Sequence, residues 1–142
     1  MSATPGSVQR SFRLSRTTSD LLDAAAQSTG ESRNALADRL LGEAVRAERH
    51  PLIRFRTGAS GRREPLLVGT RLLVRQVVAT LRGHDGNVED SASYLGVVPR
   101  VVRAALSYYA EFAAEVDADV DWAARIESDE RARWEREEAA LA

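Results

Sequence analysis

The chain has 142 residues, of which 44% are apolar and 29% charged, and its net charge is −1. It contains no cysteine, which excludes a disulfide framework and thiolate metal sites. No apolar run reaches the roughly 20 residues of a membrane-spanning helix, and the first residues lack the basic and apolar regions of a secretory signal. We therefore expect a globular protein located in the cytoplasm, with no membrane partner.

The small net charge conceals an uneven distribution along the chain. Residues 1–110 hold 16 Arg against 10 Asp and Glu, a net of +6, whereas residues 111–142 hold 4 Arg against 11 acids, a net of −7. All 20 basic residues are arginine, whose planar guanidinium suits phosphates and base edges. The asymmetry indicates a basic body for a polyanion and an acidic C-terminal segment with another role. The alternative for that segment is a solvated terminus.

A short strand is predicted near the N-terminus, after a polar stretch of small residues, 1–9, that we expect to be a mobile arm. In residues 11–16, SFRLSR, apolar and polar side chains alternate, which is the period of a half-buried strand. A lone strand leaves its backbone groups unpaired and is not stable in water. The pattern therefore requires a partner strand from elsewhere.

Two helices are predicted after the strand. Thr17 and Asp20 have the spacing of a capping box, and Gly30 ends the first helix. Ser32 caps the second helix, which Pro51 prevents from continuing. The apolar residues of the second helix recur three and four positions apart: Leu36, Ala37, Leu40, Leu41, Ala44 and Val45.

Residues 10–49 are too few to bury a core alone, so antiparallel pairing of two copies is expected to supply the missing strand. The residues expected at the dimer interface are Phe12, Leu14, Leu36 and Leu40. The outward-facing strand residues expected to contact bases in a major groove are Ser11, Arg13 and Ser15. Those expected to contact phosphate, at the start of the second helix, are Ser32, Arg33 and Asn34. The alternative is a ribbon that only dimerises the chain.

The FRLS of this strand and the GESRN between the two helices resemble the ribbon-helix-helix repressors of the Arc, MetJ and CopG type. The resemblance covers about residues 10–47. In that family the outward strand residues contact bases and a serine in the turn contacts phosphate. The resemblance implies the first role for Ser11, Arg13 and Ser15 and the second for Ser32.

A domain boundary is predicted near residue 50, with residues 50–65 as a linker. The glycines, serine and proline of TGASGRREP, 57–65, indicate an exposed loop, and the apolar runs LIRF and PLLV on either side fit short strands. Residues 66–116 then form a second domain. Its first helix contains four apolar residues at i, i+3, i+4 and i+7: Val74, Val77, Val78 and Leu81.

Two more helices are predicted in this domain, one capped by Asn87 and one opened by Pro99. The inward-facing residues of the second are expected to be Val102, Ala105, Leu106 and Tyr109. Ala92 and Gly96 have the spacing of a helix-turn-helix. The exposed residues of its second helix, Arg100, Arg103 and Ser107, are candidates for DNA contact. The alternative is a plain trihelical or dimer module, because Val98, Val101 and Ala104 crowd the same face.

Residues 50–118 resemble the domain-of-unknown-function family 433, whose members include VapB-like antitoxins. The resemblance lies in LLVGTRLLVRQVV, NVEDSASYLG and VRAALSYYAEF. Members often sit beside a PIN-like ribonuclease toxin, which the antitoxin binds through its C-terminal segment. The acidic tail, residues 117–142, is expected to be helical. Its apolar residues Trp122, Ile126 and Trp134 are expected to bind such a toxin.

No enzymatic site is predicted. His50 and His84 have neither a neighbouring nucleophile nor the spacing of metal ligands, so both are expected in turns or on the surface. No glycine-rich loop of the phosphate-binding kind is present. We therefore expect no catalysis, no cofactor and no metal site.

The sequence thus predicts a mainly α protein: a ribbon-helix-helix dimer with one short strand per chain, a helix-turn-helix-like domain and a helical tail. The predicted function is that of a DNA-binding antitoxin and transcriptional autorepressor. Its expected partners are double-stranded operator DNA, further copies of the chain in a dimer or higher oligomer, and a PIN-like ribonuclease toxin. The alternatives are a free-standing transcriptional regulator and an interaction scaffold that binds no DNA.

Overall fold

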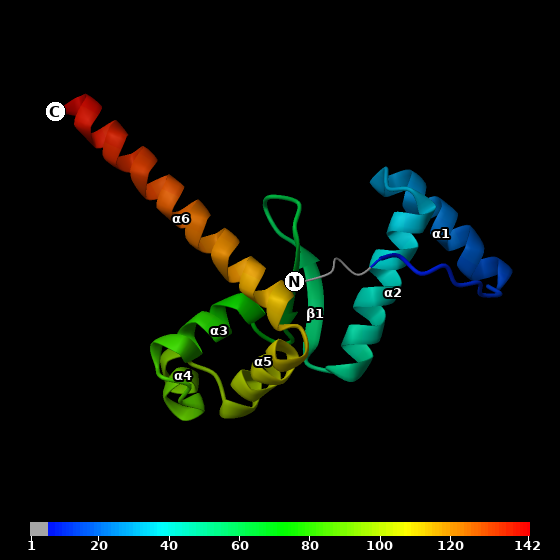
Figure 1. Cartoon of the computed structure of the whole chain (residues 1–142), viewed down its shortest axis with the longest axis horizontal. Helices are drawn as coiled ribbons and strands as arrows, with labels where there is room; N and C mark the ends of the chain where they lie inside the picture. The colour runs from blue at the N-terminus through cyan, green and yellow to red at the C-terminus, as the bar shows by residue number, and fades with distance from the viewer. Residues whose placement is uncertain (1–5) are drawn as a thin grey trace. The chain divides into compact units, whose positions relative to one another are not determined.

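A computed structural model describes residues 6–142, which are mainly helical, with six helices and one two-stranded antiparallel sheet among them (Figure 1). The predicted arm, residues 1–9, lies largely outside the described residues, and residues 6–9 are exposed without regular secondary structure. The chain divides into two compact units, unit 1 up to Gly42 and unit 2 from Glu43 to Ala142. None of the described helices has both the length and the apolarity that a membrane crossing requires.

Unit 1 consists of α1 (Arg16–Thr29) and most of α2 (Arg33–Arg49). A serine precedes each helix, and its Oγ accepts a hydrogen bond from the backbone N–H three residues further on, at 3.1 Å in both cases. These bonds satisfy N–H groups that a helix start otherwise leaves without partners. The cap at Ser32 confirms the prediction for α2, whereas the cap of α1 is Ser15.

The predicted start of α1 is wrong. The capping box assigned to Thr17 and Asp20 is not used, because Ser15 lies two residues earlier and already caps the helix. Gly30 ends α1 as predicted, at φ 75°, a left-handed conformation that glycine adopts at little cost.

The segment before α1 is not a β-strand in the single chain. Residues 6–14 have no regular secondary structure, and Arg16 already belongs to α1. The strand expected over residues 11–16 is therefore absent from the isolated chain. A strand is defined by its partner, and no described residue pairs with this segment.

Unit 2 begins with the last turns of α2, which are followed by a hairpin formed by β1 (Ile53–Thr57) and β2 (Arg63–Leu67). Its antiparallel register pairs Ile53 with Leu67, and both side chains are fully buried. The short strands on either side of a loop agree with the sequence pattern. Residues 50–65, expected to form a linker, therefore belong to the folded part of unit 2.

A buried carboxylate stabilises the loop end of this hairpin. Glu64 is only 6% exposed, and its oxygens lie 3.7 Å from Arg56 Nε and 3.8 Å from Arg75 Nε. A Cβ at Gly58 would come within 2.7 Å of Glu64 Oε2. Glycine at position 58 therefore leaves the room that the carboxylate occupies.

Three helices follow the hairpin: α3 (Val74–Gly83), α4 (Val88–Leu95) and α5 (Pro99–Glu111). The first and third pack against the hairpin, and α4 packs against α3 and α5. The predicted helix starts of α4 and α5 are confirmed. Asn87 Oδ1 accepts a hydrogen bond from a backbone N–H of the first turn of α4 at 2.9 Å, and Pro99 is the first residue of α5.

The core of unit 2 forms between these helices, the hairpin and the start of α6. All four predicted apolar residues of α3 are buried. In α5 the prediction was partly wrong, because Leu106 is exposed and Tyr109 only half-buried, whereas Tyr108 is buried. The buried core residues are Ile53, Leu67, Val74, Val77, Val78, Leu81, Ala92, Val102, Ala105, Tyr108 and Val116.

The acidic C-terminal segment forms one long helix, α6 (Ala113–Leu141), which confirms the expected helical tail. Its first turns pack on unit 2, where Val116 is buried and Val120 contacts the core. From Ala124 onward nearly every side chain is exposed. In Figure 1 this second half (orange to red) runs to the C-terminus with no other element of unit 2 beside it.

Candidate nucleic-acid interface

An apolar groove of about 850 Å³ lies on one face of unit 1. It runs between the extended segment before α1 and the facing sides of α1 and α2. Phe12 and Leu14 are exposed to 66% and 51% although both are large and apolar. The residues that line the groove are Phe12, Arg13, Leu14, Thr18, Leu21, Leu22, Ala25, Ala37, Leu40 and Leu41. Unit 1 thus leaves the face exposed that a small helical domain normally buries.

The predicted dimer residues fall into two groups. Phe12, Leu14 and Leu40 all line the open groove. Leu36 is instead only 1% exposed and is buried within its own chain. Apart from Ala26, it is the one buried residue of unit 1 among those described. Two buried side chains make a minimal core, so most of the apolar surface of unit 1 faces outward.

In the extended segment beside the groove, backbone groups lack hydrogen bonds and arginines lack ion pairs among the described residues. Among the described residues, the N–H and C=O groups of residues 6–14 make no hydrogen bond. Arg10, Arg13 and Arg16 are exposed and make no ion pair with any described residue. Ser11 is exposed, whereas Ser15 is engaged in capping α1. The predicted base contact by Ser15 would therefore compete with its cap.

The turn between α1 and α2 places the three predicted phosphate contacts together at the start of α2. Ser32 Oγ caps the helix, and Arg33 Nε lies 2.9 Å from Asp23 in an exposed ion pair. Asn34 is exposed. An exposed ion pair of this kind contributes little, so Arg33 can leave Asp23 for a phosphate.

In unit 2, α4 and α5 meet at the turn on which the helix-turn-helix prediction depends. Ala92 is buried where the helices cross, and Gly96 ends α4 at φ 70°. The backbone N–H of Val97 donates to Ala92 O at 3.0 Å, which closes the end of α4. Val102 is fully buried on the facing side of α5. These observations agree with the expected spacing, and DNA contact by α5 stays a prediction.

The two predicted arginine contacts of α5 differ in their surroundings. Arg103 Nη2 donates to Glu89 Oε1 of α4 at 2.8 Å, with both side chains largely exposed. Arg100 makes no ion pair with any described residue and borders a small pocket that also includes Ser107. Of the two arginines, Arg100 is therefore the one available to an external anion.

The acids at the start of the C-terminal segment pair with arginines of the same unit. The pairs are Arg49 with Glu111, Arg46 with Glu115, Arg82 with Asp117 and Arg62 with Asp119. Hydrogen bonds from Arg82 and Tyr109 lower the pKa of Asp117, and a hydrogen bond from Arg49 lowers the pKa of Glu111. The charge asymmetry of the sequence is therefore partly neutralised within unit 2.

The three predicted toxin-binding residues of α6 also differ in exposure. Trp122 is half-buried, with the guanidinium of Arg62 4.7 Å from its ring centroid. This cation–π contact gives Trp122 a partner within its own chain. Ile126 and Trp134 are exposed to 40% and 60%. The two outer residues are therefore more exposed than Trp122, and toxin binding by all three stays a prediction.

Sequence reasoning missed the role of His50. Its side chain is nine-tenths buried, and its ring lies edge-on to Tyr108 and Phe112, with ring centroids 5.3 and 5.9 Å apart. The expectation of a turn or surface residue holds for its position, because His50 lies in the turn that follows α2, but not for its side chain, which is buried. Burial raises the pKa of Tyr108 to about 12. The only signal in the sequence was the group of aromatic residues in SYYAEF. Nothing in the sequence indicates that these residues contact His50.

Unit 1 thus has an open apolar groove and arginines without ion pairs among the described residues. In unit 2, by contrast, arginines form ion pairs with acids of the C-terminal segment. Comparison with family models, with curated proteins and with solved structures gives no match to this chain. The function must therefore be inferred from the residues themselves.

Proposed function

We propose that this chain is a homodimeric DNA-binding repressor that acts as the antitoxin of a toxin–antitoxin pair. The observation that carries the proposal is the combination in unit 1 of an open apolar groove with an extended segment of unpaired backbone. Pairing of two copies would bury the apolar groove and also provide hydrogen-bond partners for the backbone.

Dimerisation follows from size and from the pattern of the extended segment. Unit 1 has about 40 residues, a length at which folding usually needs a metal, a disulfide or a second chain. Antiparallel pairing of two copies of residues 11–15 would satisfy their backbone groups. It would also carry Phe12 and Leu14 over the groove, because alternate side chains of a strand share one face.

DNA binding follows from the charges that such a ribbon would present. Alternation places Arg13 on the face opposite Phe12 and Leu14 once the strand is formed. A two-stranded ribbon fits a major groove, and arginine contacts guanine there in bidentate fashion. Arg10 and Arg16 flank this position and are likewise unpaired among the described residues. They suit the phosphates on either side.

A partner protein is supported by the outer half of α6. Ile126 and Trp134 are exposed on a helix that has no neighbour in unit 2 at that point. Exposed tryptophan is typical of interface anchors. Residues 126–142 contain six acids and three arginines, which suits a basic, RNA-binding partner surface such as that of a ribonuclease.

Salt-dependent binding to the protein's own promoter tests the DNA-binding part. Three unpaired arginines per chain give six in a dimer, so the logarithm of affinity should fall with a slope of about −5 against the logarithm of salt concentration. A scrambled fragment of the same length is the control. If the full chain binds neither fragment at low salt, the DNA-binding function is excluded and the scaffold alternative gains support.

Truncation after Arg125 tests the antitoxin part. A cut after Val116 would be less informative, because it also removes Asp117 and Asp119 from Arg82 and Arg62. Loss of residues 126–142 should abolish neutralisation of the nuclease-like product of an adjacent gene while promoter binding persists. A paired substitution of Glu127 and Arg131 to alanine, which removes an exposed pair but no anchor, should retain neutralisation.

The second candidate is a free-standing transcriptional regulator without a toxin. It is favoured by the pairing of Glu111, Glu115, Asp117 and Asp119 with arginines of unit 2, which gives these acids a role that needs no partner. Promoter binding without any neutralisation of an adjacent gene product would identify this alternative.

A further inference from the structure

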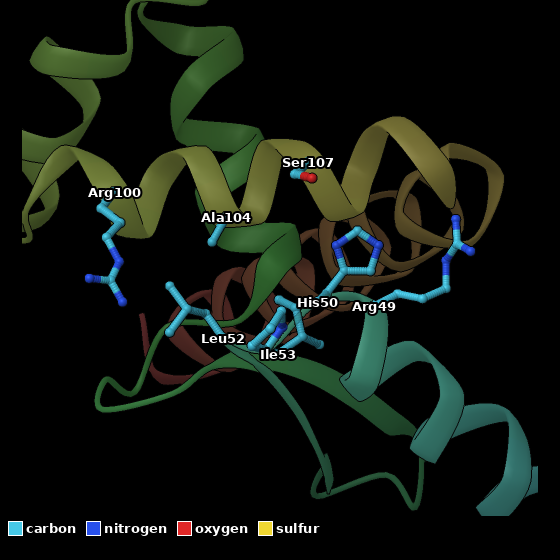
Figure 2. A pocket seen from close by; sticks show the side chains of 8 residues that line it. Arg49, His50, Leu52, Ile53, Arg100, Ala104 and Ser107 are labelled. Atoms are coloured by element: carbon cyan, nitrogen blue, oxygen red, sulfur yellow. The ribbon is translucent and has the colours of Figure 1, made fainter.

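A pocket of about 280 Å³ lies in unit 2 between α5 and the turn that joins α2 to β1 (Figure 2). The turn is closed by the backbone N–H of Ile53, which donates to His50 O at 2.9 Å. The residues that line the pocket are Arg49, His50, Pro51, Leu52, Ile53, Arg100, Ala104 and Ser107. The volume is just below the range of about 300–1,000 Å³ that is usual for ligand pockets. Only a small molecule would fit.

The polar groups of the pocket favour an anion. Its lining contains two arginines and a histidine but no carboxylate. Glu111 already neutralises Arg49 through two hydrogen bonds of 2.7 and 2.9 Å, so Arg49 is held in place. Arg100 has no such partner among the described residues. It also lies in the first turn of α5, where the helix dipole adds positive potential.

A buried polar side chain forms part of the pocket wall. The side chain of His50 is 9% exposed, and its Nε2 lacks a hydrogen-bond partner among the described residues. The carboxylate of Glu111 lies 3.5 Å from Nε2. In Figure 2 the His50 ring rises from the turn toward α5, near Ser107. Ser107 is exposed and makes no hydrogen bond with its side chain among the described residues.

The remaining lining is apolar. Leu52, Ile53 and Ala104 lie between Arg100 at one end and the pair of His50 and Ser107 at the other. Ile53 is the first residue of β1 and is fully buried, so this wall is fixed by the hairpin. A ligand that fills the pocket would therefore need an apolar body with an anionic group at one end.

The geometry points to a binding site for a small organic carboxylate in this pocket. The carboxylate would pair with the guanidinium of Arg100, and a short apolar or aromatic body would lie against Leu52, Ile53 and Ala104. Hydrogen-bonding substituents at the far end would meet Ser107 and His50. This site does not depend on DNA binding or on dimerisation, because all its residues belong to unit 2.

Titration of the full-length protein with benzoate, followed by ¹H–¹⁵N NMR, tests the site. Benzoate should shift the backbone amides of Leu52, Ile53, Ala104 and Ser107 and reach saturation at about 10 mM or below. Benzamide has the same shape without the charge, and should bind at least about tenfold more weakly. Inorganic phosphate has the charge without the apolar body, and should also bind more weakly.

Two variants sharpen the test. Arg100→Gln should weaken benzoate binding about tenfold or more, and Ser107→Leu should block it by filling the pocket. Arg125→Gln, which removes an exposed and unpaired arginine of α6, should change nothing. Equal binding of benzamide, equal or tighter binding of phosphate, or unchanged affinity in Arg100→Gln would each overturn the proposal.

Discussion

Unit 1 and unit 2 both contain packed helices but complete their cores to very different degrees. Unit 1 buries only Ala26 and Leu36 among its described residues and leaves a groove of about 850 Å³ open. Unit 2 buries a continuous apolar cluster, closed by a hairpin on one side and by the first turns of α6 on another. Unit 2 thus buries its apolar face within the single chain, whereas in the proposed dimer unit 1 would bury its face against a second chain.

The largest effect is expected from a charge placed in the open groove. Leu14→Glu should abolish the dimer and unfold unit 1, because each copy loses about 1.5–3 kcal/mol of burial and the dimer contains two copies. Analytical ultracentrifugation measures the mass, and circular dichroism measures the helix content that unit 1 contributes.

A matched control separates this effect from charge in general. Val98→Glu also replaces an exposed apolar residue with an acid, but in unit 2 and outside the groove. It should leave the dimer intact. If Leu14→Glu is monomeric and retains all its helix content, unit 1 folds alone and the comparison between the units fails.

A smaller effect is expected from a cavity in the closed core. Ile53→Ala should lower the stability of unit 2 by about 2–5 kcal/mol, because Ile53 is fully buried where β1 meets the helices. Thermal unfolding followed at several protein concentrations distinguishes the two units. The transition of unit 2 should move equally at every concentration, whereas that of unit 1 should depend on concentration. One transition that shifts as a whole would show that the units unfold together.

The helices of unit 2 were predictable because their signals are local. The spacing of Val74, Val77, Val78 and Leu81 defines one buried face, and Asn87 and Pro99 mark helix starts by their own side chains. The predicted N-terminal strand is not formed in the single chain, where no described residue pairs with that segment. Local alternation can predict a strand's face but cannot supply its neighbour.

The candidate site was predicted less completely for a related reason. The exposed arginines of residues 10–16 follow from the sequence, but their freedom from ion pairs does not. Arg62 and Arg82 are paired by Asp119 and Asp117, residues more than thirty positions away. Such pairs depend on how α6 packs, and the composition of the chain cannot show which arginines form them. The role of His50 was missed on the same ground, because its aromatic partners are distant in the sequence.

A specificity effect should separate the arginine proposed to contact bases from the arginine proposed to contact phosphate. Arg13→Ala should reduce discrimination between promoter and scrambled DNA by about 1–3 kcal/mol, the worth of one bidentate base contact. Arg33→Ala should weaken both by similar amounts, since phosphate contacts carry no sequence information. Arg71→Ala removes an exposed, unpaired arginine of unit 2 and is the control. Equal losses on both DNAs for Arg13→Ala would mean that the ribbon does not read bases.

The smallest expected effect is a pH-dependent contribution of the packing of α6 to the stability of unit 2. Asp117 accepts hydrogen bonds from Arg82 and from Tyr109, the latter at 2.9 Å, and these bonds lower its pKa in the folded state. A carboxyl group with a lowered folded-state pKa stabilises the fold at pH values above its ordinary pKa of about 3.9. That contribution is lost as the pH falls through the folded-state pKa. Both partners are about half exposed, so the contribution is modest.

Asp117→Asn should therefore lower the melting temperature of unit 2 slightly at pH 7, and the difference from the wild type should be smaller at pH 2 than at pH 7. Asp121→Asn is the matched control, because Asp121 is exposed on the same helix and makes no ion pair among the described residues. It should show no difference at either pH. A difference for Asp117→Asn that stays constant from pH 7 to pH 2 would mean that the side chain acts through packing. The closure of unit 2 by α6 would then not depend on the charge of this carboxylate.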